Sequence, residues 1–169
     1  LRRATVAVAG CCAATSMAMY VAGSRAGTSA EGSALAGYLI RGATLGMDKQ
    51  WRGVRAELLK NVHGRVLDVG CAAGLYLQYF ADSARRVTEV VALEPNATMH
   101  AALRDTIARV APPFPVVVTA QFLEELPPSF DRSFDSILLG NVLCEVPDVP
   151  AALAEVDRLL RPGGRVYYS

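Results

Sequence analysis

The sequence predicts an α/β fold whose core is a doubly wound, mainly parallel sheet. Three observations lead to this expectation. A short apolar run at 66–69 ends in a glycine-containing turn at 70–74, the turn leads directly into a helical stretch, and further short apolar strands alternate with helices after it. Gly70 and Gly74 can adopt the positive φ values that such a tight turn needs. The turn places backbone N–H groups at the carboxyl edge of the sheet, where they suit a polar ligand.

The individual elements follow from apolar periodicity, β-branched runs and helix breakers. We expect strands at about 65–69, 87–93, 116–119, 133–139 and 165–168, and helices at about 47–62, 75–84, 98–110 and 149–160. The segment Arg-Pro-Gly-Gly at 161–164 predicts a sharp turn before the fifth strand. Together these elements predict one domain over 47–169.

Composition limits the classes of function. A length of 169 residues suits one domain with an appendage, and a net charge of +1 argues against a nucleic-acid partner. The four cysteines form no Cys-x-x-Cys pair and there are only two histidines, so we expect neither a metal site nor a disulfide framework. An apolar content of 52% is high for a soluble domain, and the excess lies at the N-terminus.

The N-terminal segment predicts a membrane anchor. Residues 4–24 carry no charge, and at about 1.5 Å per residue this run is long enough to cross a hydrocarbon core of about 30 Å. We therefore expect a transmembrane anchor helix at 1–25 and, because the next stretch is rich in Gly, Ser, Ala and Thr, a linker at 26–46. The expected location is a membrane, either the mitochondrial inner membrane or the endoplasmic reticulum.

Small residues spaced by four line one face of this run: Gly10, Ala14, Ala18 and Ala22. Such a face lets a second helix approach closely in lipid, which predicts a partner transmembrane helix or a membrane complex. Other interpretations remain open. The first 30 residues contain three Arg and no acid, as in a mitochondrial transit peptide, and a secretory signal or a soluble helix also fits.

Four segments carry a resemblance to a known family. They are VLDVGCAAG at 66–74, VVALEPN at 90–96, FDSILLGNVL at 134–143 and LLRPGGRVYY at 159–168. In order and spacing they resemble class I S-adenosylmethionine-dependent methyltransferases. The resemblance implies a Rossmann-like fold with S-adenosylmethionine as the cofactor. The family's sheet has seven strands in the order 3-2-1-4-5-7-6, of which this sequence supplies five, so we expect a C-terminally incomplete sheet.

The first strand and its turn supply half of the expected cofactor site. The turn residues Gly70, Cys71, Ala72 and Gly74 are expected to receive the carboxylate of the cofactor, although many family members have a glycine in place of Ala72. Asp68, at the end of the strand, is expected either to hold the amino group or to orient the turn.

The other half of the expected site comes from later strands. Glu94, 24 residues after Gly70 and followed by Pro95, suits both ribose hydroxyls. Phe122 and Leu123 fall where family members bond the adenine amine. Phe122 offers a stacking surface but no acid for that amine. Asn141, after the fourth strand, lies where substrates reach the methyl group, and the preceding Gly140 would let them come close.

These observations predict a membrane-anchored S-adenosylmethionine-dependent methyltransferase acting on a small molecule. No catalytic residue is assigned, because an activated sulfonium needs little beyond positioning of the acceptor. A narrower resemblance, to the membrane-associated thiol methyltransferases of the methyltransferase-like 7 group, implies a small hydrophobic thiol. The alternatives are an inactive accessory subunit of a mitochondrial membrane complex that has lost the cofactor, and a nicotinamide-dependent oxidoreductase.

Overall fold

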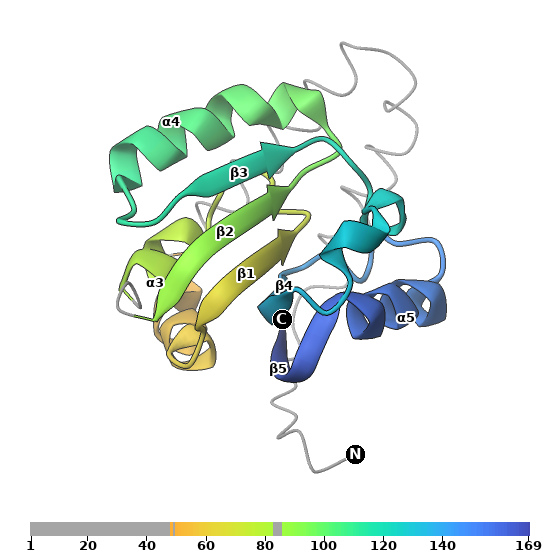
Figure 1. Cartoon of the computed structure of the whole chain (residues 1–169). Coiled ribbons are helices and arrows are strands. Elements are labelled where there is room, and N and C mark those ends of the chain that lie inside the picture. The colour runs from red at the N-terminus through yellow and green to blue at the C-terminus, as the bar shows by residue number, and fades with distance from the viewer. Residues whose placement is uncertain (1–47, 49, 83–85) are drawn as a thin grey trace.

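The computed structural model describes residues 48, 50–82 and 86–169. Its centre is a five-stranded sheet in the order β3-β2-β1-β4-β5, in which every pair of neighbouring strands is parallel (Figure 1). The strands are β1 (Gly64–Val69), β2 (Val87–Leu93), β3 (Val116–Thr119), β4 (Phe134–Leu139) and β5 (Leu160–Tyr168). The expected mainly parallel sheet and its strand order are confirmed.

Helices pack on the strands, as the alternating pattern predicts. They are α3 (Leu77–Asp82), α4 (His100–Val110) and α5 (Val149–Leu159), with single 3-10 turns at Ala97–Met99, Leu123–Glu125 and Pro128–Phe130. Residues 50–59 form a further helix before β1. None of the helices in the described residues is both long and apolar enough to span a bilayer. The expected anchor at 1–25 and linker at 26–46 lie outside the described residues.

Alternate residues of each strand supply two separate cores. Val66, Val90 and Leu138 face the side covered by the helix at 50–59, α3 and α4, whereas Leu67 and Leu139 face α5. Asp68 stands on the same side of β1 as Val66, since it is two residues further along the strand. Its side chain is therefore directed to the α3 and α4 side of the sheet, close to the glycine turn.

Two local expectations are wrong. The segment at 161–164 does not precede the fifth strand but lies inside β5 as an irregularity, because Leu160 pairs with Phe134 and Arg165 with Ser136. In the helix at 50–59, the spacing of Trp51, Val54 and Leu58 predicts one buried face, but Val54 is 53% exposed. Arg55, next to it, is buried. A buried Arg needs an acidic partner, and the structure supplies one beside the candidate site.

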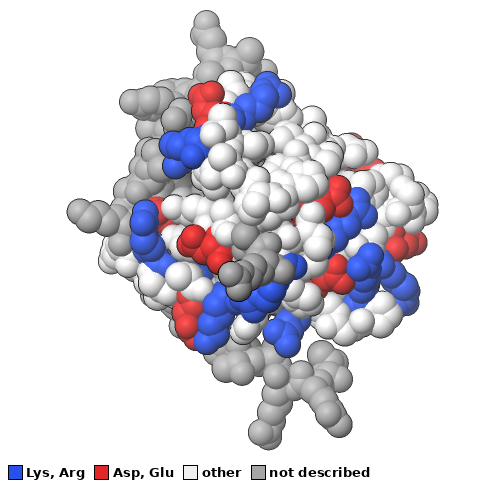
Figure 2. All heavy atoms as spheres, turned by 60° about the vertical axis from the view of Figure 1, so that its left-hand side comes forward, with Lys and Arg blue, Asp and Glu red and all other residues white. Residues whose placement is uncertain are grey.

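The charged side chains are mixed on the surface. Figure 2 shows Lys and Arg interspersed with Asp and Glu over the face turned toward the viewer, without a continuous patch of either sign. This distribution agrees with the net charge of +1.

Candidate cofactor site

The glycine turn closes tightly onto the end of β2. Gly70 has a φ of 63°, and a Cβ at this position would lie 2.7 Å from Cγ2 of Val142. The N–H groups of Gly70 and Cys71 both donate to the carbonyl of Leu93, at 2.8 and 3.1 Å. The turn thus needs glycine at position 70 for both its conformation and its space.

The N–H groups at all four expected turn positions are already engaged. Besides Gly70 and Cys71, the N–H of Ala72 donates to Glu94 and that of Gly74 donates to the carbonyl of Cys71. These four N–H groups are therefore not free in this structure, and the expected contact of the turn residues with the carboxylate of the cofactor stays a prediction. Within the described part of the chain, no partner is recorded for the N–H groups that follow in the same turn, those of Ala73, Leu75 and Tyr76.

Glu94 points into the turn and not away from it. It is 7% exposed, and its two carboxylate oxygens accept from the N–H of Ala72 at 2.7 Å and of Asn96 at 2.8 Å. Burial raises the pKa of Glu94, against the opposing effect of these two hydrogen bonds. Each oxygen keeps a further lone pair. The carboxylate can therefore still accept hydrogen bonds from the two hydroxyl groups of a ribose.

Asp68 is the most unusual group of the site. It is 1% exposed, and neither carboxylate oxygen has a hydrogen-bond partner among the residues that the structure describes. Burial, with a smaller contribution from the charge of Glu94, raises the pKa of Asp68 to about 8. Both expected roles of Asp68, holding the amino group and orienting the turn, stay predictions. A buried carboxylate without a partner is costly, and a cationic ligand relieves that cost.

Two non-glycine residues hold left-handed backbone conformations beside the turn. Ala72 has a φ of 48°, in the position where a glycine is common in the resembling family. Its side chain makes this conformation unfavourable by about 1–2 kcal/mol. Asn141 has a φ of 56°, which Asn tolerates better than other residues. Backbone strain of this kind persists where the surroundings enforce it and is concentrated at ligand sites.

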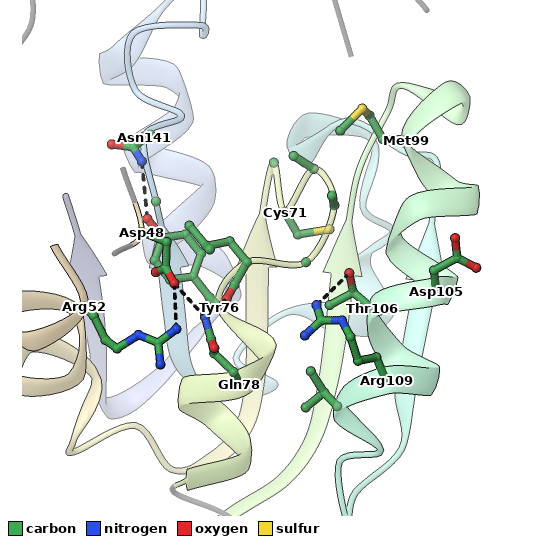
Figure 3. Close-up of a pocket in the computed structure, with 17 residues that line it drawn as sticks. Asp48, Arg52, Cys71, Tyr76, Gln78, Met99, Asp105, Thr106, Arg109 and Asn141 are labelled. Atoms are coloured by element: carbon green, nitrogen blue, oxygen red, sulfur yellow. Dashed lines mark hydrogen bonds and ion pairs between the residues drawn. The ribbon is translucent and has the colours of Figure 1, made fainter. Parts of the chain in front are cut away.

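A cavity of about 500 Å³ opens beside the turn. Figure 3 shows its walls: Tyr76 and Asn141 on one side, Met99 and Thr106 on the α4 side, and Gln78 below. Asp68, Glu94 and Phe122 do not line it. The cavity therefore reaches the turn after β1 and the end of β4 and extends along α4 to Val110, whereas the groups expected for ribose and adenine lie outside its wall.

The ring of Tyr76 packs on Gly140 at the cavity wall. A Cβ added at Gly140 would overlap Cε2 of the Tyr76 ring, so the ring packs directly on that glycine. The Tyr76 hydroxyl accepts a long hydrogen bond from Nδ2 of Asn141 at 3.4 Å and lies 3.2 Å from Oγ of Ser169. Gly140 nevertheless lines the cavity, and the approach of a substrate at Gly140 and Asn141 stays a prediction. Gly140 makes room for a tyrosine of the protein itself.

Sequence reasoning missed a buried polar cluster around Asp48. Its carboxylate accepts from Nη1 of Arg55 at 3.0 Å, the hydroxyl of Tyr79 at 2.7 Å and Nε2 of Gln78 at 3.3 Å. Burial would raise the pKa of Asp48, but the hydrogen bonds from Tyr79, Arg55 and Gln78 outweigh it and lower the pKa. The cluster fixes the helix at 50–59 against α3. Its only sequence signal was a charged pair at 48 and 55, spaced for one helix face.

The two residues expected at the adenine end of the site, after β3, differ in exposure. Phe122 is 57% exposed, whereas Leu123 is 5% exposed and packs in the core under α5. Only the backbone of Leu123 can therefore reach a ligand.

Pro95 is half-buried next to Glu94. Sequence reasoning also missed His100, whose Nε2 lies 2.7 Å from the carbonyl oxygen of Glu94 and holds the end of β2.

The fold and the site together define a class of protein. Parallel strands, a glycine turn after β1 and an acid after β2 are the elements of an α/β domain that binds a nucleoside-containing cofactor at the carboxyl edge of its sheet. Residues 67–168 match the model of the methyltransferase domain family. The chain belongs to this family, and the expected resemblance to class I methyltransferases is confirmed.

Known relatives and structures agree with this assignment. The chain is 34% identical over 105 residues to the ubiquinone biosynthesis O-methyltransferase of Xanthomonas oryzae, covering 62% of this chain and 42% of that protein. It is 32% identical over 124 residues to the demethylmenaquinone methyltransferase of Roseiflexus castenholzii, covering 73% of this chain and 50% of that protein. The chain thus spans half or less of the length of these curated relatives. A SAM-dependent methyltransferase from Aquifex aeolicus shares the fold, with a TM-score of 0.58 and 22% identity. The match covers 68% of this chain and 62% of that one.

Proposed function

We propose that the protein is an S-adenosylmethionine-dependent methyltransferase that acts on a small molecule. The observation that carries this proposal is the buried carboxylate of Asp68, which has no hydrogen-bond partner among the described residues. It lies next to the glycine turn, and Glu94, which closes that turn, can still accept hydrogen bonds from two hydroxyl groups. A cationic amino acid joined to a ribose needs this combination of groups. The residues present therefore fit the cofactor.

The residues divide the work of binding between them. Asp68 balances the positive charge of the ligand, and Glu94 accepts the ribose hydroxyls. The N–H groups of Ala73, Leu75 and Tyr76 have no recorded partner in the described part of the chain and suit a carboxylate. S-adenosylmethionine supplies an activated methyl group when it is bound. The chain then has to hold an acceptor in line with that group, which is largely a matter of positioning.

The chemistry of the acceptor is proposed from the relatives. Two of them are named for methylation in quinone biosynthesis, which supports a hydroxylated aromatic or quinol acceptor. A small hydrophobic thiol remains the second candidate, from the narrower resemblance of the sequence. No catalytic base is assigned. Asp48, the one buried acid among the described residues of the cavity wall, is already paired with Arg55.

A transfer assay tests this proposal. The full chain is incubated with methyl-labelled S-adenosylmethionine and one acceptor at a time. The acceptors are a demethylated quinol, a catechol and an alkyl thiol, and the products are identified by mass spectrometry. We expect label in one acceptor class, a strong loss with Glu94→Gln, and no loss with Glu57→Gln, because Glu57 is an exposed acid on the helix at 50–59. Absence of label from every acceptor, while a related methyltransferase labels its own, would argue against catalysis.

An inactive accessory subunit is the alternative function. It is favoured by Phe122, which provides no acid where the resembling family binds the adenine amine. Recovery of the chain in stoichiometric association with a membrane complex, without affinity for S-adenosylmethionine, would support this alternative. Tight binding of the cofactor by the isolated protein would eliminate it.

We extend the proposal to membrane attachment through 1–25, in the mitochondrial inner membrane or the endoplasmic reticulum. The support is the uncharged run at 4–24 in the sequence. The full chain should float with phosphatidylcholine vesicles in a density gradient, and Ala14→Arg should abolish flotation because a charge in the middle of the run is costly in lipid. Full recovery of the unaltered chain in the vesicle-free fraction would contradict membrane attachment.

A further inference from the structure

The order of the strands sets the order of ligand groups along the edge of the sheet. The neighbouring strands β4, β1, β2 and β3 end at Asn141, the glycine turn, Glu94 and the segment that contains Phe122. If the amino-acid end of the cofactor lies at β1 and the ribose at β2, as the proposed function requires, the purine must extend over the end of β3. That direction leads away from β4 and toward Phe122.

Phe122 is unusually exposed for an aromatic residue in a fixed position. It is 57% exposed, the largest value among the exposed large hydrophobic residues in the described chain. Its backbone is held by two reciprocal hydrogen bonds. Its N–H donates to Oε2 of Glu125 at 2.7 Å, and its carbonyl accepts from the N–H of Glu125 at 3.1 Å. An aromatic ring that is more than half exposed on a backbone held in this way is suited to stacking a planar base.

The polar groups around Phe122 are directed into the loop itself. The side-chain amide of Gln121 donates to the carbonyl of Glu125 at 3.3 Å, and its oxygen lies 3.1 Å from Oγ1 of Thr119. The carboxylate of Glu125 is engaged by the N–H of Phe122. Glu124 is the remaining acid of this segment, and it is exposed. A carboxylate in contact with water discriminates weakly between donors, because water competes for it.

We propose that Phe122 provides a stacking surface for the purine of the cofactor and that the site does not recognise the 6-amino group of adenine. Affinity at this end of the ligand then comes from the area of the ring face. Every purine presents such a face, whereas only adenine presents the amine. This inference rests on the proposed function, because it needs the ribose at Glu94.

Calorimetric binding tests the inference without requiring turnover. The two probes are S-adenosylhomocysteine and its 6-deamino analogue, which lacks the amine but keeps the ring nitrogens. We expect their dissociation constants to agree within about threefold, because a hydrogen bond from the amine to a charged acceptor would separate them by about tenfold or more. Phe122→Ala should weaken both probes by about tenfold. Val117→Ala, at an exposed valine within β3, should weaken neither.

A gain-of-recognition variant sharpens the test. Phe122→Asp places a carboxylate at the end of β3, where the bound purine would cover it and exclude competing water. The variant should therefore create a preference for S-adenosylhomocysteine of about tenfold over the deamino analogue. A preference of that size in the unaltered protein, or full affinity in Phe122→Ala, would overturn the inference while leaving the proposed function in place. If S-adenosylhomocysteine itself fails to bind, both the inference and the proposed function are wrong.

Discussion

Replacing Asp68 with asparagine should make the protein more resistant to unfolding at high pH than the unaltered chain. The pKa of Asp68 is raised from its ordinary 3.8 to about 8, mainly by burial. In the unfolded chain this carboxyl loses its proton near pH 4, whereas in the folded protein it keeps the proton up to about pH 8. The folded state binds more protons over that interval, so its stability falls as the pH rises.

The structure sets the size of this effect. A pKa difference of about 4 corresponds to about 5 kcal/mol of lost stability above pH 8, of which about 3–4 kcal/mol arises between pH 5 and pH 8. The amide that replaces the carboxyl cannot ionise, so the stability difference between Asp68→Asn and the unaltered protein should grow in favour of the variant across this range.

Urea unfolding at pH 5 and pH 8, with Asp105→Asn as control, measures the difference directly. Asp105 is exposed, so its replacement should change the free energy of unfolding by less than about 0.5 kcal/mol at either pH. A constant stability difference between Asp68→Asn and the unaltered protein at both pH values would refute the reasoning. That result would mean that the carboxyl has a partner in the folded protein and is not reserved for a ligand.

Three further substitutions test other contacts of the site. Glu94→Gln leaves an N–H of the turn without its acceptor, and we expect a loss of about 1–3 kcal/mol in the free energy of urea unfolding. Gly140→Ala should cost about 1–3 kcal/mol through overlap with the Tyr76 ring, and the double variant with Tyr76→Leu should recover most of it. Asp48→Asn leaves Arg55 buried without a charge partner and should cost about 3–5 kcal/mol, whereas Arg52→Gln, at an exposed side chain 3.4 Å from Asp48, should cost less than about 1 kcal/mol. Because the pKa of Asp48 is lowered in the folded state, the stability from this cluster is present above pH 4 and is lost as the pH falls below that value.

The fold could be predicted from the sequence because its signals are local. The β-branched run at 116–119 became β3 with the expected bounds, and the helices at 100–110 and 149–159 follow their apolar periodicity closely. The irregularity in β5 could not be predicted in the same way. Pro and Gly at 162–164 signal a turn locally, and only pairing with β4 on both sides of them makes the segment part of a strand.

The positions of the two acids of the site could be predicted from the sequence, whereas the hydrogen bonds and packing contacts around them could not. Asp68 lies near the end of β1 and Glu94 directly follows β2, and parallel strands bring their ends to one edge. Which N–H groups remain free could not be read from the sequence, because it depends on how the turn closes on Leu93 and Glu94. The packing of Tyr76 on Gly140 is equally non-local, since it joins residues from two separate strand ends.

The most direct test of the cofactor site is a calorimetric titration with S-adenosylmethionine at pH 7 in two buffers of different ionisation enthalpy. We expect a single site and the release of about one proton, because the ligand's positive charge converts Asp68 from the protonated to the ionised form. Asp68→Asn should release none. Absence of binding heat in both buffers, or binding by the unaltered protein without proton release, would contradict a site built around the buried carboxyl of Asp68.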